Sequence, residues 1–492
     1  MSGCFKAEEI LRSTGGSYDP RFTVPDAEQS VASVSTDTRS IEPGEGFFAF
    51  AGEKYDAHDH LNAAVEKGAS ILVVADPSKT PAGFNGVVII VEDTLRAYQD
   101  LAAYYLDKID PYVIAVTGSV GKTTLKDMIF CLVKDDLNTV ATQGNLNNQI
   151  GVPKTILGMP EDTEVVVLEM GMGGPGEIRR LAEIARPNTA AITNIGISHR
   201  ECFDSDDGIM FEKLAIASQM KSGDRLIIDR ENHDALTRHA RADSEEKGYN
   251  LIEVSSKATD KAPCMADFCY GPVYFDSDEL ATSFEIESGD TAERFLVPVP
   301  GDYVAASAAL ACAAVAKLGI NLGTAVNGLK SLARTPHRLQ PIKKDGILVI
   351  DDTYNASPDS MKSGLAFLKS VSASRRIAVL ADMNELGPES DALHRDIGRG
   401  IGKDIVAGCM HSLICFGKKA AAITEGAAET AGREMVANGR IRAYDDQAEL
   451  IRFALEEKEI GDAYLVKGSH SMHMEIVADA LLGQYVGGGV DD

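Results

Sequence analysis

The chain is organised around the stretch Val113-Ile-Ala-Val-Thr-Gly-Ser-Val-Gly-Lys-Thr-Thr124. It opens with a short apolar run, which predicts a buried strand, and continues into a tight turn that contains glycine. Apolar residues then recur with the spacing of one helix face, at Leu125, Met128, Ile129, Leu132 and Val133. Together these elements predict an anion site, because free backbone N–H groups and the helix dipole both attract negative charge.

Lys122 and Thr123 make this turn a candidate phosphate loop for a nucleotide. A lysine at this position can reach the β- and γ-phosphates, and the following hydroxyl can bind Mg²⁺. The usual spacing places the first glycine of such a loop where Val116 stands, so the glycine of this chain, Gly118, is displaced. The alternative is an ordinary strand-to-helix turn, which the Lys-Thr-Thr sequence disfavours.

Length and charge limit what the protein can be. A chain of 492 residues is too long for one hydrophobic core, and we expect three domains. Apolar residues make up 44% and charged residues 25%, which is typical of soluble globular proteins. The formal net charge of −26 argues against a nucleic-acid partner, since a phosphate backbone needs a basic face.

The sequence also predicts a cytoplasmic location. Its start, at Met1, lacks the apolar region of a secretory signal. No apolar run approaches the ~18 residues of a membrane-spanning helix. The eight cysteines form no CxxC pair, so we expect neither a zinc site nor a disulfide framework, and a reducing compartment fits this pattern.

Charged and polar residues follow the expected strands in the middle of the chain. Glu169 ends the apolar run Val165–Leu168, and His199 follows a further strand. A carboxylate at the C-terminal end of a buried strand lies where α/β sheets bind ligands and metals, and the nearby phosphate loop favours Mg²⁺ over a helix cap or an ion pair. Lys213 falls on an expected helix over Gly208–Met220, where a lone lysine is usually a solvated charge.

Two further polar segments allow more than one interpretation. The loop Gly144–Pro153 carries several asparagines between glycines, so it could approach a ligand closely or be a solvated turn. The segment Ser35–Arg39 could be a surface turn capped by its aspartate. Neither pattern decides its function alone.

The expected elements divide the chain into three α/β units. Residues 1–110 form a small unit, and residues 111–335 form a second unit that begins near the phosphate loop and includes a β-hairpin excursion over about 255–300. In residues 336–492 strands alternate with helical stretches, which predicts a parallel, doubly wound sheet with right-handed crossovers. These strands are expected at Ile347–Ile350, Ile377–Leu380, Leu413–Phe416 and Tyr464–Val466.

Taken together, these motifs resemble those of the Mur ligases, the ATP-dependent amide ligases of cell-wall precursor assembly, over nearly the whole chain. The shortened phosphate loop resembles theirs, and so do the segments around Glu169, His199 and Lys213. Ser35-Thr-Asp-Thr-Arg39 resembles part of the uridine-nucleotide-binding first domain of the family. The likeness is strongest to the members that add D-alanyl-D-alanine to UDP-N-acetylmuramoyl-tripeptide. Its marks are Gly144–Pro153, Asp351–Pro358, Leu380–Gly387 and Val466–Met472.

The resemblance implies an architecture, a reaction and its ligands. The first unit would be a UDP-sugar-peptide-binding α/β domain, the second a central P-loop ATPase domain with a doubly wound, mostly parallel sheet, and the third a Rossmann-like ligase domain. ATP would phosphorylate the tripeptide carboxylate, and the amine of D-Ala-D-Ala would attack the acyl phosphate. The implied cofactors are ATP and two Mg²⁺ ions, the partners are these two small-molecule substrates, and we expect a monomer.

The resemblance also implies roles for individual residues. The catalytic residues would be Lys122, Glu169, His199 and Lys213. The metal ligands would be Thr123, Glu169, His199 and Lys213 as a carbamate, since carbamylation turns a cation into a carboxylate-like anion. ATP contacts are expected from Thr117, Gly118, Ser119, Val120, Gly121, Lys122, Thr123, Thr124, Asn194, Arg338 and Asp352. Substrate contacts are expected from Thr38, Arg39, Asn145, Asn148, Asn355, Lys467 and Ser469.

The sequence departs from the family pattern at several positions. The central helix opens with Gly301-Asp-Tyr-Val304 and carries Ser307, where the family usually has Gly-x-His-Asn and a later Asn. His337 stands where a glycine usually precedes Arg338, and His470 replaces a common arginine. Two alternatives therefore stay open. One is a Mur-ligase-like enzyme for another acceptor, such as a cofactor or a different wall polymer, and the other is a catalytically silent nucleotide-binding protein.

Overall fold

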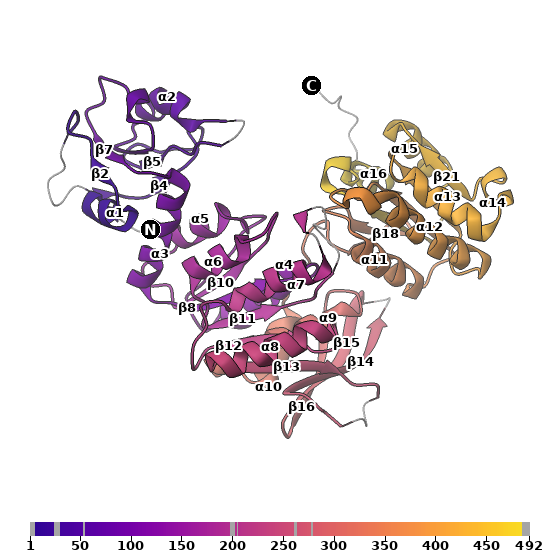
Figure 1. Cartoon of the computed structure of the whole chain (residues 1–492). Coiled ribbons are helices and arrows are strands. Elements are labelled where there is room, and N and C mark those ends of the chain that lie inside the picture. The colour runs from indigo at the N-terminus through magenta and orange to yellow at the C-terminus, as the bar shows by residue number, and fades with distance from the viewer. Residues whose placement is uncertain are drawn as a thin grey trace.

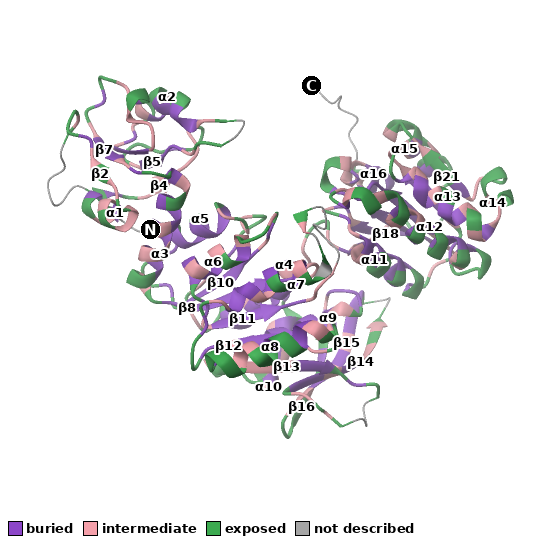
Figure 2. Ribbon diagram, viewed as in Figure 1, coloured by how far each residue is buried: buried purple, intermediate pink, exposed green. Residues whose placement is uncertain are grey.

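The computed structural model describes residues 5–23, 30–52, 55–196, 202–203, 205–259, 263–276 and 279–484, without the side chain of Asp206. It is mixed α/β and forms three lobes in chain order, each built on its own main sheet (Figure 1). The parallel strands are largely buried, and the helices that pack on them have exposed outer faces (Figure 2). The predicted α/β class is therefore confirmed.

The first lobe is small and shares its core with the middle lobe. Its sheet has the order β2-β7-β6-β5-β4, in which β2 is antiparallel to β7 and the other pairs are parallel. In α3, Tyr98 and Tyr105 pack edge-to-face on Phe48 and Phe5, and this cluster continues into the middle sheet. The strands are β1 Phe5–Lys6, β2 Ser17–Tyr18, β3 Ser30–Val31, β4 Val34–Ser35, β5 Gly46–Phe48, β6 Ile71–Val74 and β7 Val87–Ile90. The helices are α1 Ala7–Thr14, α2 Leu61–Glu66 and α3 Thr94–Ile109.

The sheet of the middle lobe is parallel over most of its width and antiparallel at one edge. In the order β16-β15-β14-β13-β12-β11-β8-β10-β9, the pairs from β14 to β9 are parallel and the pairs among β14, β15 and β16 are antiparallel. The strands are β8 Tyr112–Thr117, β9 Thr139–Ala141, β10 Val165–Glu169, β11 Thr189–Ile192, β12 Arg225–Asp229, β13 Asn250–Ser256, β14 Phe268–Asp276, β15 Ala281–Ser288 and β16 Thr291–Val297. The helices are α4 Lys122–Val133, α5 Gly151–Leu157, α6 Glu177–Ala185, α7 Asp206–Leu214, α8 Asp234–Lys247, α9 Tyr303–Val315 and α10 Leu322–Lys330.

The third lobe is a doubly wound sheet with one antiparallel edge. In the order β17-β18-β22-β19-β20-β21, β17 is antiparallel to β18 and the remaining pairs are parallel. The strands are β17 Gln340–Lys344, β18 Ile347–Asp352, β19 Arg375–Ala381, β20 Ser412–Phe416, β21 Ile441–Tyr444 and β22 Asp462–Lys467. The helices are α11 Pro358–Ser370, α12 Ser390–Val406, α13 Ala421–Ala431, α14 Glu434–Ala437, α15 Gln447–Glu456 and α16 Glu475–Leu481.

The β14–β15 hairpin of the middle lobe reaches the third lobe. Phe275, near the end of β14, makes an edge-to-face contact with Phe367 of α11, with ring centroids 4.9 Å apart. Leu280, just before β15, packs in the core of the third lobe. Arg334, in the segment between the lobes, donates to the carbonyls of Leu280 at 3.2 Å and Pro298 at 2.9 Å. The third lobe therefore rests on the hairpin as well as on its covalent connection.

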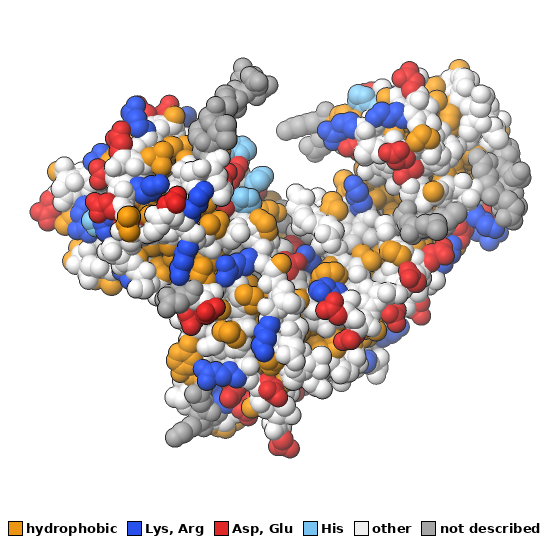
Figure 3. Space-filling model, turned by 180° about the vertical axis from the view of Figure 1, so that it is seen from behind, with side chains coloured by type: hydrophobic (Ala, Val, Ile, Leu, Met, Phe, Trp, Pro, Cys, Tyr) orange, Lys and Arg blue, Asp and Glu red, His pale blue; other side chains and the backbone are white. Residues whose placement is uncertain are grey.

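Seen from behind, the surface is hollowed between the first and third lobes, with the middle lobe below them (Figure 3). Within the described part of the chain, no helix is long and apolar enough to cross a membrane. Short 3-10 helices lie at Ala57–His60, Pro77–Lys79, Ala215–Ala217, Ala316–Leu318, Gly387–Glu389 and His470–Met472.

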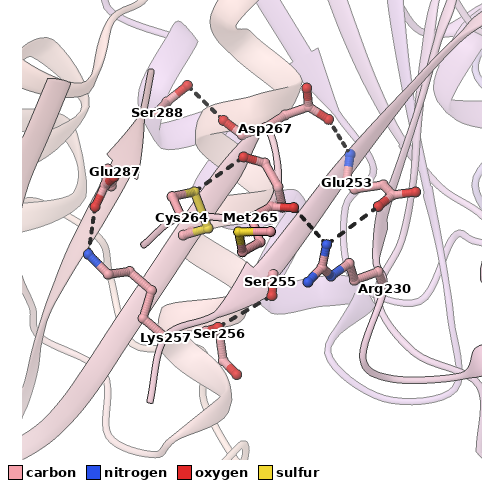
Figure 4. The surroundings of a disulfide bond; sticks show 12 residues. Arg230, Glu253, Ser255, Ser256, Lys257, Cys264, Met265, Asp267, Glu287 and Ser288 are labelled. Atoms are coloured by element: carbon pink, nitrogen blue, oxygen red, sulfur yellow. Dashed lines mark hydrogen bonds and ion pairs between the residues drawn. A yellow bond between two sulfur atoms is a disulfide. The ribbon is translucent and has the colours of Figure 1, made fainter. Parts of the chain in front are cut away.

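The expectation about cysteines is wrong at one place, because the structure joins Cys264 and Cys269 in a disulfide. Cys264 precedes β14, and Cys269 is the second residue of that strand; their Cα atoms lie 5.6 Å apart. Arg230 fixes the turn by donating to the carbonyl of Met265 at 2.7 Å (Figure 4). The pattern of cysteine spacing carries no sign of this local loop.

The expected helix over Gly208–Met220 is also too long. The α-helix ends at Leu214, and Ala215–Ala217 continue it as a 3-10 turn. Its first residues follow Ser205, whose hydroxyl accepts from the N–H of Gly208 at 3.2 Å and so marks the helix start. Apolar periodicity continues through the tighter turn, so the sequence does not show where the α-helix stops.

Candidate active site at the phosphate loop

The predicted strand, turn and helix are present as β8, a loop and α4. Gly118 and Gly121 have φ values of 145° and 84°, in the region that favours glycine. A Cβ at Gly118 would lie 1.8 Å from the hydroxyl oxygen of Thr193. The loop therefore needs glycine at the displaced position for both its backbone conformation and its close packing.

The end of β11 holds the loop from behind. The Thr193 hydroxyl donates to the carbonyl of Val120 at 2.6 Å, and the N–H of Val120 donates to Oδ1 of Asn194 at 2.8 Å. The N–H of Ser119 donates to the carbonyl of Asn194 at 3.0 Å. Asn194, predicted as an ATP contact, thus shapes the loop itself, and sequence reasoning missed the part played by Thr193.

Glu169 is the last residue of β10 and lies beside the loop because β10 pairs with β8 in register Glu169–Val116. Its side chain is buried. One carboxylate oxygen accepts from the Thr123 hydroxyl and the other from the side-chain amide of Asn147, both at 2.8 Å. Both partners are neutral, and no ion pair to Glu169 is found within the described ranges. The structure therefore brings together two predicted metal ligands, Thr123 and Glu169.

The asparagine loop contributes differently from the prediction. Asn147, which was not among the predicted contacts, binds Glu169. Oδ1 of Asn148 accepts from the N–H groups of Ile150 at 3.1 Å and Gly151 at 2.9 Å, so this side chain caps the start of α5. Asn145 is exposed and remains available to a ligand. The cluster of asparagines pointed to this loop, but the contact of each one depends on the fold.

Lys122 is folded back onto the loop. Its ammonium donates to the carbonyls of Gly118 at 2.8 Å and Ser119 at 3.3 Å. Burial lowers the pKa of Lys122, the nearby Glu169 carboxylate raises it again, and the Arg338 guanidinium lowers it further. Lys122 is therefore under the influence of charged groups from both the middle and third lobes.

Lys213 lies on α7 with only 2% of its surface exposed. Its amine has a weak contact with the sulfur of Met172 at 3.9 Å. Burial lowers the pKa of Lys213 well below its usual value, the charge of Lys122 lowers it further, and Glu212 opposes both. The amine is thus biased toward the neutral, nucleophilic form. The carboxylate of Glu212 is occupied elsewhere, because it accepts from the N–H groups of Gly176 and Ile178 at the start of α6.

In the third lobe, the predicted contacts Asp352 and Lys467 bind each other. The Lys467 ammonium lies 2.7 Å from one oxygen of Asp352 and donates to the carbonyl of Asn355 at 2.8 Å. Burial raises the pKa of Asp352, and the Lys467 charge opposes this. The hydroxyl of Ser469 accepts from the N–H of Asn384 at 2.8 Å. Asp352 and Lys467 thus form a buried ion pair at the carboxyl ends of the neighbouring strands β18 and β22.

The third lobe approaches the phosphate loop directly. A Cβ at Gly196 would lie 2.3 Å from a carboxylate oxygen of Asp359, in the first turn of α11, and 3.3 Å from Cβ of Ser119. The Thr335 hydroxyl donates to Asp127 of α4 at 3.0 Å. A small cavity between α4 and the segment before β17 is lined by Thr124, Asp127, Tyr303, Arg334, Thr335 and Arg338, among others. The candidate site thus includes residues of two lobes.

Thr38 and Arg39 lie in a turn of the first lobe. The Arg39 guanidinium binds both carboxylate oxygens of Asp37, with Nε 3.0 Å from one and Nη2 2.7 Å from the other. Asp37 also accepts from the N–H of Arg39 at 2.9 Å, so the aspartate-capped turn is present. The Arg39 contacts lower the pKa of Asp37 to about 2, and the charge of Lys154 on α5 contributes. The turn therefore lies within electrostatic reach of the middle lobe.

His199, one of the predicted metal ligands, lies outside the described residues. Among the residues that the structure does describe, no three His, Cys, Asp or Glu side chains form a group that could hold a metal ion. Thr123 and Glu169 are a pair of predicted metal ligands whose oxygen atoms the structure places in direct contact.

Comparisons with known proteins identify relatives over most of the chain. The Mur ligase middle domain matches residues 116–316, and the glutamate ligase domain of the Mur ligases matches residues 337–470. The chain is 35% identical over 468 residues to the UDP-N-acetylmuramoyl-tripeptide--D-alanyl-D-alanine ligase of Bacillus subtilis (strain 168), covering 93% of this chain and 95% of that protein. It is 32% identical over 459 residues to the ligase of the same name from Escherichia coli (strain K12), covering 92% and 94%.

A crystal structure of MurF from Acinetobacter baumannii superposes with a TM-score of 0.86 at 26% sequence identity, covering 98% of this chain and 99% of that one. The phosphate loop, the parallel sheets and these matches define the class of protein: the chain belongs to the Mur ligase family. The Bacillus and Escherichia relatives, which it resembles over nearly their whole length, are named for the addition of D-alanyl-D-alanine.

Proposed function

We propose that the chain is an ATP-dependent amide ligase that joins D-alanyl-D-alanine to UDP-N-acetylmuramoyl-tripeptide in peptidoglycan precursor synthesis. The observation that carries this proposal is the Thr123–Glu169 contact of 2.8 Å beside a fully built phosphate loop, in a chain similar over most of its length to ligases of that name. The reaction takes place in the cytoplasm, and the enzyme works as a monomer.

Amide formation needs activation, because a carboxylate is a poor electrophile. ATP transfers its γ-phosphoryl group to the tripeptide carboxylate, the amine of the dipeptide attacks the acyl phosphate, and phosphate leaves. The main task of the protein is to stabilise negative charge on the transferring group. Lys122 serves this task, since its ammonium can exchange the carbonyls of Gly118 and Ser119 for phosphate oxygens. The free N–H groups at the start of α4 add to this effect.

Thr123 and Glu169 would hold a magnesium ion, and their chemistry fits. Magnesium prefers oxygen ligands, and both side chains present oxygen. The carboxylate of Glu169 is buried, and a bound cation would balance its charge. When bound, the ion neutralises charge on the phosphate oxygens. The second ion of the family is assigned to Glu169, His199 and Lys213 by resemblance.

The state of Lys213 that suits this site is a carbamate. A neutral lysine amine can form an N–C bond with CO₂ and release a proton, and the lowered pKa of Lys213 favours the neutral amine. The product is anionic and can orient a cation that a free ammonium would repel. A carbonyl carbon signal in the NMR spectrum of protein equilibrated with ¹³C-bicarbonate, lost in Lys213→Ala, would support the assignment. A spectrum unchanged by that substitution contradicts it.

In the proposed enzyme, different domains bind the different substrates. We place the boundaries near residues 110 and 335, with the UDP-sugar-peptide bound by the first domain through Thr38 and Arg39, and ATP bound by the central domain. The hollow between the first and third lobes leaves room for the peptide (Figure 3). Asn145, Asn355, Lys467 and Ser469 would contact the substrates. Because Arg338 and Asp352 reach ATP from the third domain, ATP binding favours closure of that domain.

Phosphate release from the purified protein tests the proposal. The complete mixture contains Mg-ATP, UDP-N-acetylmuramoyl-tripeptide and D-Ala-D-Ala, and each is omitted in turn. Release that needs all three, with a product heavier by one dipeptide, is the expected result. Binding of ATP without release in the complete mixture would indicate another acceptor.

A further inference from the structure

The segment before β17 presents Arg338 between two residues with left-handed backbone. His337 has φ 60° and Leu339 has φ 44°, although neither is glycine. Such a conformation is costly for residues with a Cβ and persists only where surrounding contacts hold it. The structure should therefore contain contacts that fix this turn.

Two consecutive carboxylates at the end of β18 provide those contacts. Nδ1 of His337 lies 2.8 Å from an oxygen of Asp351, and the N–H of Leu339 donates to Asp352 at 3.0 Å. Asp351 is buried, and its other oxygen accepts from the Thr353 hydroxyl at 2.7 Å. The carboxylate is thus held in place, so it can fix the imidazole.

A backbone hydrogen bond also holds the turn, in addition to the contacts of Asp351 and Asp352. Together these contacts set the direction of the Arg338 side chain. The carbonyl of His337 accepts from the N–H of Tyr354 at 3.0 Å. The Arg338 guanidinium then lies over the ring of Tyr354, 3.9 Å from its centroid. Arg338 also lines the cavity next to Thr124 of α4, just beyond the phosphate loop. The turn therefore aims a cation toward the nucleotide side of the domain interface.

We propose that His337 is a positioning residue: held by Asp351, its imidazole fixes the left-handed turn that presents Arg338 to the γ-phosphate of ATP. The inference rests on the proposed function, which assigns Arg338 to the nucleotide. Glycine would adopt the left-handed backbone at this position without strain. Histidine does not, so its side-chain contact with Asp351 is needed to stabilise that conformation.

The test compares the binding of two nucleotides to the full chain. The dissociation constants of Mg-AMP-PCP, which has a γ-phosphonate, and of Mg-ADP, which has none, are measured by calorimetry. In His337→Ala we expect about tenfold weaker binding of Mg-AMP-PCP and less than about twofold change for Mg-ADP. His337→Asn should recover most of the loss, because asparagine tolerates left-handed backbone and can donate to Asp351.

Asp345 provides a matched control. It is exposed, has φ 49° and lies in the turn between β17 and β18. Asp345→Ala imposes the same kind of backbone strain in the same lobe, so it should lower the melting temperature without changing the ratio of the two constants. The same ratio change in Asp345→Ala and His337→Ala would mean a merely structural effect and would overturn the proposal.

Arg338→Ala separates this inference from the proposed function. The preference for Mg-AMP-PCP is the ratio of the Mg-ADP dissociation constant to that of Mg-AMP-PCP. If Arg338→Ala lowers this ratio, and His337→Ala combined with Arg338→Ala lowers it no further, His337 acts through Arg338. If Arg338→Ala loses the preference and His337→Ala keeps it, the positioning role is wrong while the assignment of Arg338 stands. If neither variant loses it, both are wrong. The three-substrate phosphate-release assay on the wild type reports separately on the ligase reaction.

Discussion

Gly118→Ala should damage the phosphate loop by an amount that the structure allows us to estimate. The φ of 145° costs an alanine about 1–3 kcal/mol of backbone strain. The new Cβ would also lie 1.8 Å from the hydroxyl oxygen of Thr193, and such overpacking costs about 1–3 kcal/mol more. The expected loss in the free energy of unfolding is therefore about 2–6 kcal/mol.

A matched variant separates the two contributions. Gly223 also has a positive φ, 96°, but a Cβ there would meet no atom within 4 Å, so Gly223→Ala reports backbone strain alone. Denaturant midpoints of the full chain, measured under identical conditions, give the difference. Thr193→Ala should partly relieve Gly118→Ala, because it removes the hydroxyl that the new Cβ meets. Equal losses in Gly118→Ala and Gly223→Ala would refute the packing argument.

Other perturbations have equally definite outcomes. Glu169→Gln keeps hydrogen-bonding groups toward Thr123 and Asn147 but removes the charge for a cation, so phosphate release should fall about 10²–10³-fold; wild-type turnover would contradict this role. Cys264→Ser with Cys269→Ser opens a small loop and should lower the free energy of unfolding by about 2 kcal/mol under oxidising conditions; equal stability of variant and wild type would argue against the bond. Arg39→Ala should raise the pKa of Asp37 from about 2 toward its ordinary 3.8 in a carboxyl NMR titration. Since the folded pKa is depressed, the stabilisation from this pair is present above pH 3.8 and is lost as the pH falls through about 2; an unchanged Asp37 titration would contradict it.

Much of the fold could be predicted because burial imposes periodicity. The apolar run before the phosphate loop follows from the burial of β8 in a separate core on each face of the sheet, and the apolar helix face after it follows from the packing of α4 in one of these cores. The parallel strands of the third lobe were predicted for the same reason, since buried strands such as Ile377–Leu380 are apolar throughout.

The rest depends on contacts between distant segments. Asn147 reaches Glu169, and Thr193 reaches Val120, only after the sheet has set their strands side by side. The burial of Lys213 could not be seen either, because a lone lysine on a helix is normally solvated. Two-residue strands such as Ser30–Val31 are too short to show alternation, and the disulfide joins cysteines whose spacing has no recognised pattern.

The aromatic contact between Phe275 and Phe367 helps to hold the third lobe, which carries Arg338, against the middle lobe. With the connecting segment alone, the third lobe would be a tethered body, and the effective concentration of Arg338 would follow from the length and stiffness of that tether. The hairpin adds a second point of support, which restricts the orientations open to the lobe compared with a lobe held by the connecting segment alone. Part of the orientational freedom of the third lobe is therefore lost when the chain folds. That part of the entropy cost does not recur each time the two-domain site is assembled around its substrates.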